Sequence, residues 1–270
     1  MKKILHIILI TIISLTVISC SSSDDSKTTT SSVSFVAVGN SGTLLTSSDG
    51  ITWTSRTSGT TKSLNGITYA NSKFIVVSGD WDANTGTIIN STDGNTWSTS
   101  ETTNYLYRVT YGNSTFVTVG KSGIILTSSD GTSWDNRTTG TTGNLWSVNY
   151  GNNTFVVVSD NGKVLTSTDG TSWTTRSTGS SVRLFGSTYG NNTFVVVGDL
   201  GTILTSLDGI TWTSRVSGTS ILLNEVTYGN DTFVVVGRSG TILNSTDNGT
   251  TWTSRTSGTP NSLYEVTYKE

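Results

Sequence analysis

The stretch STDGTSW (Ser167–Trp173) decides the fold, because the chain carries six versions of it. A serine, an aspartate and a glycine followed by a tryptophan are typical of a tight turn that leads into a packed aromatic ring. We call each copy a box, and the other five begin at Ser47, Ser91, Ser128, Ser206 and Ser245. The last four box aspartates, Asp130, Asp169, Asp208 and Asp247, recur every 39 residues. This period is too short for a domain and suits one four-stranded blade of a repeat protein.

One repeat unit is predicted to form four short strands. Within residues 184–215 the runs LFGSTY, TFVVVG, GTILTS and WTSR are rich in β-branched and aromatic residues and are bounded by Gly, Asn or Asp. The segments YGNNTF and GDLG are hairpin signals between these runs. No helical periodicity follows residue 32, and Pro260 is the only proline. The sequence therefore predicts an all-β domain.

The two ends of the repeat region set the number of blades. The N-terminal piece begins at a second strand, because Phe35 stands where the other units have Phe74, Phe116, Phe155, Phe194 and Phe233. The C-terminal piece SLYEVTY is a first strand with no second strand after it, and it ends at Tyr268. We therefore expect a six-bladed β-propeller over residues 33–270, with four strands in each blade. The C-terminal strand is expected to pair with the N-terminal strands and close the ring.

The N-terminal segment is typical of a secretory leader. Lys2 and Lys3 precede an apolar run that ends in VISC at Cys20. This ending resembles the bacterial lipoprotein signal, which implies that residues 1–19 are removed and Cys20 is lipidated. Residues 20–32 are Ser/Thr-rich and are expected to form a flexible tether. The resemblance implies a lipid-anchored protein of the bacterial outer membrane that faces either the periplasm or the cell surface.

Composition excludes several kinds of chemistry in a chain without this leader. Cys20 is the only cysteine and His6, inside the leader, is the only histidine, so thiol catalysis, Ser/His triads and Cys/His metal sites are not expected. The formal net charge is −2 and there is no basic run, which argues against nucleic-acid binding. We expect no cofactor, no metal and a monomer.

The box STDNGTTW at Ser245 matches the pattern S-x-D-x-G-x-T-W in full. On this pattern, residues 33 to 268 resemble the Asp-box, or bacterial neuraminidase repeat, propellers. The other five boxes are one residue shorter, which departs from the family pattern and weakens kinship with sialidases. Propellers of this kind include sialidases, sortilin-type receptors, glycan hydrolases and photosystem II assembly factors, so the resemblance implies a fold and leaves the activity open.

The box itself is expected to be structural, because a catalytic site seldom needs six copies of one residue. Its carboxylate can accept hydrogen bonds from nearby backbone amides, and its tryptophan can pack between sheets. The residues concerned are Asp49, Asp93, Asp130, Asp169, Asp208 and Asp247 with Trp53, Trp97, Trp134, Trp173, Trp212 and Trp252. Arginines that recur three residues after a box tryptophan, such as Arg56 and Arg215, are interpreted as solvated or ladder-paired residues of the outer strand.

Function is expected where the repeats differ, on the face opposite the boxes. This variable face is formed by the turns between second and third strands and by the connections between blades. Blade two carries an insertion, GDWDANTG, with Trp81 between Asp80 and Asp82. Loops on a rigid scaffold often carry recognition, so these residues are candidates for ligand binding. The alternative is that Trp81 folds back onto the neighbouring blade.

A second set of candidates lies at the start of each innermost strand. The residues at this position are Asn65, Tyr107, Trp146, Phe185, Asn224 and Tyr264. The residues that follow them are Gly66, Arg108, Ser147, Gly186, Glu225 and Glu265. Around a channel mouth these side chains would stack on a ligand and bond its polar groups, and the alternative is packing between blades. Off-pattern cations are Lys62, Arg108, Lys121, Lys163, Arg183 and Arg238, of which Arg108, Arg183 and Arg238 are candidates for a carboxylate-binding cluster.

The favoured function is a non-enzymatic propeller that binds a glycan or a protein through the variable face. A glycoside hydrolase of sialidase type is one alternative, and Glu225 with Glu265 is the only carboxylate pair proposed for it. Tyr264 and Glu265 are sequence neighbours on a predicted strand and would point to opposite faces, which is unsuitable for a nucleophile pair. An assembly or scaffold factor with a stable protein partner is the other alternative.

Overall fold

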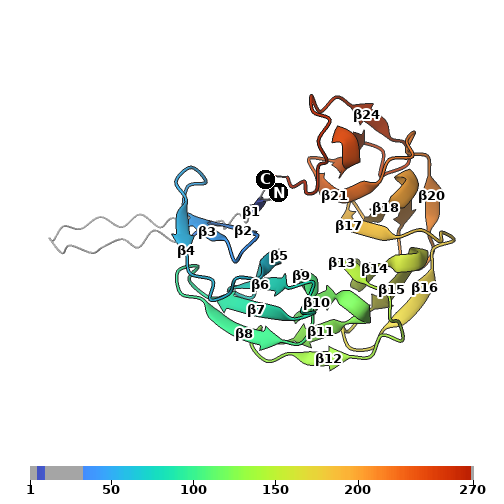
Figure 1. Ribbon diagram of the computed structural model, residues 1–270. Coiled ribbons are helices and arrows are strands. Elements are labelled where there is room, and N and C mark those ends of the chain that lie inside the picture. The colour runs from blue at the N-terminus through green and yellow to red at the C-terminus, as the bar shows by residue number, and fades with distance from the viewer. Residues whose placement is uncertain (1–4, 10–32, 269–270) are drawn as a thin grey trace, which may run out of the picture.

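The computed structural model describes residues 5–9 and 33–268, which form six four-stranded antiparallel sheets and a few single-turn 3-10 segments (Figure 1). We call each sheet a blade and number the blades in chain order. All-β architecture with six blades of four strands confirms this part of the prediction from the repeat. Within the described ranges, no helix is long and apolar enough to cross a membrane.

The strands follow the repeat unit closely. Blade one has β1 (Leu5–Leu9), β2 (Phe35–Gly39), β3 (Leu44–Ser47) and β4 (Thr54–Arg56). Blade two has β5 (Ser63–Ala70), β6 (Lys73–Gly79), β7 (Gly86–Ser91) and β8 (Ser98–Thr102). Blade three has β9 (Leu106–Gly112), β10 (Thr115–Gly120), η1 (Lys121–Gly123), β11 (Ile125–Ser128) and β12 (Asp135–Arg137).

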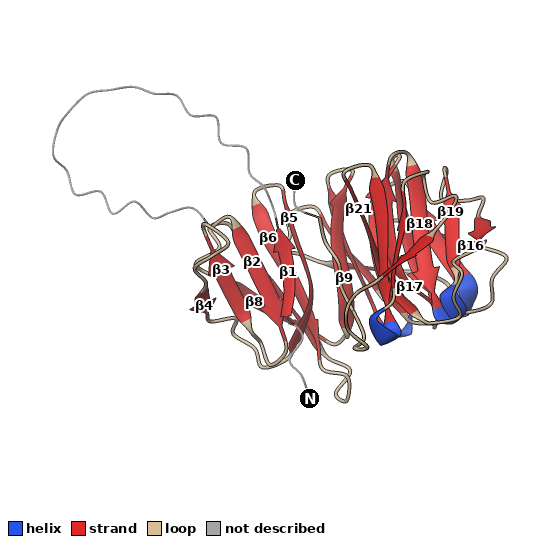
Figure 2. Cartoon of the chain, turned by 90° about the horizontal axis from the view of Figure 1, so that it is seen from above, coloured by secondary structure: helices blue, strands red, loops and turns tan. Residues whose placement is uncertain are grey.

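The last three blades each carry a 3-10 turn between the second and third strands. Blade four has β13 (Leu145–Gly151), β14 (Thr154–Ser159), η2 (Asp160–Gly162), β15 (Lys163–Ser167) and β16 (Thr174–Ser177). Blade five has β17 (Leu184–Gly190), β18 (Thr193–Gly198), η3 (Asp199–Gly201), β19 (Ile203–Ser206) and β20 (Thr213–Arg215). Blade six has β21 (Leu223–Gly229), β22 (Thr232–Gly237), η4 (Arg238–Gly240), β23 (Ile242–Ser245) and β24 (Thr253–Arg255). Figure 2 shows the 3-10 turns that are in view at one end of the strands.

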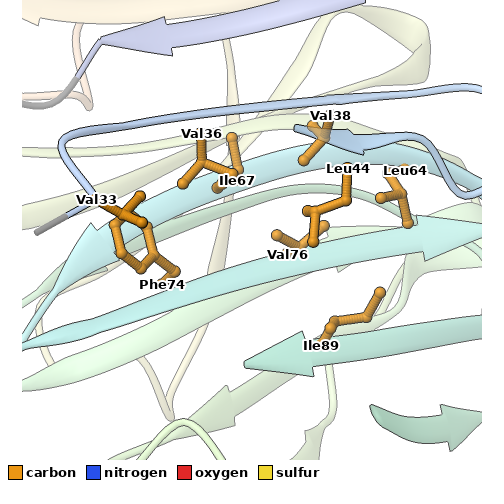
Figure 3. Close-up of a cluster of buried hydrophobic side chains, with 9 residues drawn as sticks. All are labelled: Val33, Val36, Val38, Leu44, Leu64, Ile67, Phe74, Val76 and Ile89. Atoms are coloured by element: carbon orange, nitrogen blue, oxygen red, sulfur yellow. The ribbon is translucent and has the colours of Figure 1, made fainter. Parts of the chain in front are cut away.

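The hydrophobic core lies between neighbouring blades. Blades two to five present Val, Ile, Leu and Phe side chains to a neighbour on each side, because their central strands are covered on two faces. Figure 3 shows one such cluster, in which Val36 and Val38 of β2 pack near Leu64 and Ile67 of β5. Among the described residues there are five clusters of this kind, and each joins one blade to the next along the chain. None of the five joins blade six to blade one.

The ring is therefore not closed, and the prediction of closure by the C-terminal strand is wrong for this structure. Residues 262–268 form no strand, and β1 pairs with β2 instead, with Leu9 opposite Phe35. The apolar run LHIIL is a good strand sequence, and the exposed edge of β2 accepts an extended segment through its backbone groups. Tyr268 packs on blade six, where a Cβ added to Gly229 would lie 2.0 Å from its ring. Figure 1 accordingly shows an incomplete ring, open between blades one and six.

Every box forms a turn between the third and fourth strands, which is one residue longer in blade six, and in five of the six boxes the tryptophan Nε1 donates to the glycine carbonyl, Trp134 being the exception among the described residues. In the box of blade four, Ser167 Oγ donates to Asp169 Oδ1 at 2.9 Å and accepts the amide of Gly170 at 2.8 Å. Asp169 Oδ1 in turn accepts the amides of Thr171 and Ser172 at 2.7 and 2.8 Å. The tryptophan closes the turn, since Trp173 Nε1 donates to Gly170 O at 3.0 Å. The polar groups of the box are thus bonded to one another, which is the geometry of a structural turn.

Backbone amides also lower the pKa of the box aspartates. The amides of Thr52 and Ile51, together with the Ser47 hydroxyl, lower the pKa of Asp49 to about 2. The amide and hydroxyl of Thr251 have the same effect on Asp247. Further out on the blade, the recurring arginine bonds the third strand, as when Arg215 Nε donates to Thr205 Oγ1 at 2.8 Å. Cys20 and the tether of residues 20–32 lie outside the described residues.

Candidate binding site on the variable face

Five aromatic side chains from blades two to five form one row of ring contacts on the variable face. Along the row the centroids are 5.6, 4.8, 4.7 and 5.3 Å apart. These separations are in the range of favourable aromatic pairs. We call the row the aromatic arc, and it runs in the order Trp81, Tyr105, Tyr107, Trp146, Phe185. The structure thus brings together four residues that the sequence nominated, and adds Tyr105.

A β-bulge in each inner strand places three members of the arc. In blade four, Leu145 pairs with Ser159 and Ser147 pairs with Val158, so Trp146 is the extra residue of the bulge. Tyr107 and Phe185 hold the same place in blades three and five. A bulge re-aims a side chain that regular alternation would direct elsewhere. The three rings therefore meet side by side although each comes from a different sheet.

The insertion of blade two supplies the exposed end of the arc. The amide of Asp80 donates to Thr85 O at 2.8 Å, and Asp80 Oδ1 accepts the amides of Asp82 and Ala83 at 3.0 and 3.1 Å, which folds the loop into a compact turn. Trp81 at its tip is 50% exposed and contacts Tyr105 edge-on. The indole therefore folds against its neighbour and still presents half of its surface.

Cations lie over the two terminal rings. Lys121 Nζ is 4.3 Å from the centre of the Trp81 ring and donates to Trp81 O at 3.2 Å. At the other end, the guanidinium of Arg183 is 5.3 Å from the centre of the Phe185 ring. Such cation–π contacts hold the ring faces in place and put positive charge at both ends of the arc.

Tyr107 is the most deeply buried ring of the arc, with 8% of its surface exposed. Within the described part of the chain its hydroxyl is buried and has no hydrogen-bond partner. Burial raises the pKa of the Tyr107 hydroxyl well above its usual range. The indole nitrogen of Trp146, by contrast, has a hydrogen-bond partner, because Nε1 donates to Asp160 Oδ1 at 2.8 Å.

Arg108 on the inner strand of blade three reaches two carboxylates, one from blade six and one from the C-terminal segment. Its Nη2 lies 2.8 Å from Glu265 Oε2 and 3.3 Å from Glu225 Oε2, and its Nη1 donates to Asn65 O at 2.7 Å. Burial, with the Glu265 charge as a second cause, raises the pKa of Glu225 to about 8. Gly186 leaves room for this carboxylate, since an added Cβ would lie 2.8 Å from Glu225 Oε1.

This arrangement bears on the enzyme alternative. Both glutamates proposed for glycoside chemistry bind one guanidinium nitrogen, and Glu225 is 7% exposed. Glycoside hydrolysis needs two carboxylates on either side of a substrate bond. Arg108 and the two glutamates instead link blade three to blade six and to the C-terminal segment.

The remaining candidates lie apart from the arc. Tyr264 is 49% exposed and takes part in none of the ring contacts of the described residues. Asn65 and Asn224 donate to backbone carbonyls of the next inner strand and of the C-terminal segment, so they join neighbouring blades. Arg183 Nε is paired with Asp199 Oδ2 at 2.7 Å, and Arg108 is paired with its own acids, so the structure does not assemble the proposed cluster with Arg238.

Tyr105 was missed by the sequence analysis although it is off-pattern. It directly precedes the first leucine of an inner strand, where the other units have Ser63, Asn144, Arg183, Leu222 and Ser262. Its ring lies over Gly79, where an added Cβ would be 2.4 Å from Tyr105 Cδ2. Comparing this column across the repeats would have singled out the residue.

An open hollow of about 670 Å³ borders the Trp81 loop, with Lys62, Asp80 and Glu101 in its lining. Lys62 and Glu101 form an ion pair there. Another hollow, of about 360 Å³, lies on the box side between blades five and six and is lined by Thr205, Asp208 and Asn248. Neither hollow contains a ring of the arc.

Comparison with known proteins gives the fold. No family model matches the chain, and no curated protein matches it. Among solved structures, "YCF48 bound to D1 peptide" is similar with a TM-score of 0.68 and 20% identity, over 87% of this chain and 81% of that one. YCF48 from Cyanidioschyzon merolae is similar with a TM-score of 0.68 and 18% identity, over 87% of this chain and 85% of that one. The computationally designed Ika8 protein is similar with a TM-score of 0.68 and 12% identity, over 87% of this chain and 75% of that one. At these identities the likeness shows that the chain has a propeller fold.

Proposed function

We propose that the protein is a binding propeller that holds an extended segment of a partner protein on its variable face, along the aromatic arc. The observation that carries this proposal is the unbroken row of five rings across four blades. Trp81 is half exposed, and Tyr105, Trp146 and Phe185 are partly exposed, whereas Tyr107 is buried beneath them. Accessible aromatic surface on a rigid scaffold gives large contact area at small entropic cost, which is why aromatic side chains are common anchors in protein recognition. One of the similar solved structures, YCF48 bound to a D1 peptide, supports a polypeptide as ligand.

The anchor and the location remain part of the same proposal. The run VISC ending at Cys20 supports a lipidated N-terminus, and the Ser/Thr-rich tether would hold the propeller clear of the bilayer. This processing would remove β1 together with residues 1–19 and leave the edge of β2 without that partner. An Asp-box propeller displayed outside the cytoplasm in this way would present its variable face to an exported protein.

The test uses the purified protein, a phage-displayed library of random dodecapeptides and a glycan array. We expect peptides to be selected, and we expect Trp81→Ala and Trp146→Ala each to weaken the binding of a selected peptide about tenfold, the loss of one interface anchor. Tyr264→Ala is the matched control, since it removes a half-exposed ring outside the arc.

Two results would contradict the proposal. One is peptide binding that both arc variants leave unchanged. The other is a glycan ligand whose binding depends on Trp81 and Trp146 in the absence of any peptide ligand, which would make the arc a sugar-stacking platform.

A further inference from the structure

Leu200 has a backbone conformation that its side chain does not favour. It lies in the middle of η3 with φ 55° and ψ 33°, in the left-handed region. Every other non-glycine residue with positive φ in the described chain is Ser, Asn or Asp. Short polar side chains are tolerated there, whereas a bulky one is an outlier that costs stability.

The other blades show which residue the turn prefers. At the same place, η1, η2 and η4 have Ser122, Asn161 and Ser239. Leu200 gains little from packing in return for its strain, because it is 69% exposed. A strained residue that the fold does not need is a reason to look for function.

A second aliphatic side chain breaks the pattern beside it. Val216 follows the last residue of β20 and is 85% exposed, whereas Thr57, Thr138 and Thr256 stand at the same place in other blades. Leu200 and Val216 directly precede two residues that lie against each other, Gly201 and Ser217. A Cβ added to Gly201 would lie 2.9 Å from Ser217 Oγ. We call Leu200 and Val216 the apolar corner of blade five.

The corner continues the aromatic arc. Arg183 joins them, because its Nε donates to Asp199 Oδ2 at 2.7 Å while its guanidinium lies over Phe185. The Arg183 side chain is 54% exposed and that of Asp199 is 20% exposed, so the pair presents mainly positive charge. An exposed cation therefore lies between the last ring and the turn that carries Leu200.

We propose that the apolar corner is the specificity end of the binding surface and takes a peptide residue with a bulky apolar side chain next to an acidic residue. This inference rests on the proposed function of the arc. The apolar side chain buries Leu200 and Val216, and the neighbouring carboxylate binds Arg183. Aliphatic side chains offer no flat ring face and no hydrogen bond to a sugar, so the corner fits a polypeptide.

The test measures peptide affinity and thermal stability of Leu200→Ser, Val216→Thr and the double variant. Leu207→Thr is the matched control, because it removes a 68% exposed leucine from the box of the same blade, at the opposite end. For a peptide selected on the unmodified protein, we expect the double variant to weaken binding at least tenfold and the control to change it less than twofold. We expect Leu200→Ser to leave the Tm unchanged or to raise it, since a left-handed turn favours Ser over Leu.

Four outcomes decide between these possibilities. If the double variant binds normally while Trp81→Ala and Trp146→Ala weaken binding, the arc is the site and the corner inference is overturned. If neither set matters, the proposed function fails with it. A Tm that falls by several degrees in Leu200→Ser would show that the leucine serves the fold and would also overturn the inference. Selected peptides that share an apolar residue beside an acidic one, and that lose affinity on Arg183→Gln, would support it.

Discussion

The rings of Tyr107 and Trp146 lie 4.7 Å apart although the two residues belong to the inner strands of different blades. Each is the extra residue of a bulge, so each sheet turns its ring toward the next sheet at the same level. The contact is what makes the variable face continuous, because it joins the rings of blades two and three to those of blades four and five. Substitutions in this surface and in the scaffold beneath it should therefore have distinct effects.

Replacing Tyr107 by Phe is expected to stabilise the protein by about 1 kcal/mol, because it removes a buried hydroxyl that lacks a partner. The ring contact with Trp146 is kept. Urea unfolding measures the change. Tyr228→Phe is the control, since that hydroxyl donates to Asp231 at 3.0 Å and its loss gives no gain. A destabilised Tyr107→Phe variant would mean that the hydroxyl has a partner after all, such as a bound water.

Replacing Gly79 by Ala is expected to destabilise the protein by about 1 to 3 kcal/mol, the usual range for overpacking. The new Cβ would lie 2.4 Å from Tyr105 Cδ2 and would push the ring out of the arc. Thermal unfolding measures the loss, and near-UV circular dichroism reports the displaced ring. In a Tyr105→Ser background the ring is absent, so adding Gly79→Ala should cost much less stability than it does in the unmodified protein. The double variant Gly79→Ala/Tyr105→Ser should therefore be nearly as stable as Tyr105→Ser alone. Additive losses would contradict the packing argument.

The repeat predicted the strands well because each blade is a local unit. Phe194 and Tyr189 face each other in blade five, as Phe155 and Tyr150 do in blade four, and such hairpin pairs are specified by a few neighbouring residues. The closing strand is a different kind of problem. It pairs segments from the two ends of the chain, and two segments with the composition of a strand, residues 5–9 and 262–268, suit one edge of β2. Local pattern does not decide which of them occupies it.

Four rings of the aromatic arc were nominated from the sequence, but their arrangement was missed. Trp146 and Phe185 were nominated because they differ between repeats, but the bulge that aims them was invisible, since it depends on the register between two strands. Arg108 and the glutamates were interpreted as ligand-binding residues, and the structure shows them bound to one another. Leu200 was overlooked because its peculiarity is a backbone angle, which sequence spacing does not reveal.

The box aspartates should make the protein sensitive to acid. Backbone amides hold the pKa of Asp49 and Asp247 at about 2, below the ordinary value. A carboxylate with a lowered folded-state pKa contributes stability that is present above its unfolded pKa and is lost as pH falls through the folded value. We expect the free energy of unfolding to fall between pH 4 and pH 2, and Asp247→Asn to make that fall shallower. Equal slopes in the two proteins would contradict the assignment, and Asp82→Asn, in an exposed loop, is the control.

Glu225 should produce the opposite dependence at higher pH. Its pKa is raised to about 8 by burial and by the nearby Glu265 charge, so the folded protein binds a proton that the unfolded chain releases near pH 4.5. The stability contributed by this proton is complete below the unfolded pKa and is lost as pH rises toward 8, by at most about 1.4 kcal/mol per pH unit.

Glu225→Gln mimics the protonated acid and should flatten the decline between pH 5 and pH 8 in urea unfolding. Glu101→Gln is the control, because Lys62 lowers the pKa of Glu101 and it titrates below this window. If the free energy of unfolding of Glu225→Gln declines with pH as steeply as that of the unmodified protein, the Glu225 carboxylate is already ionised beside Arg108. One guanidinium then binds two fully charged carboxylates.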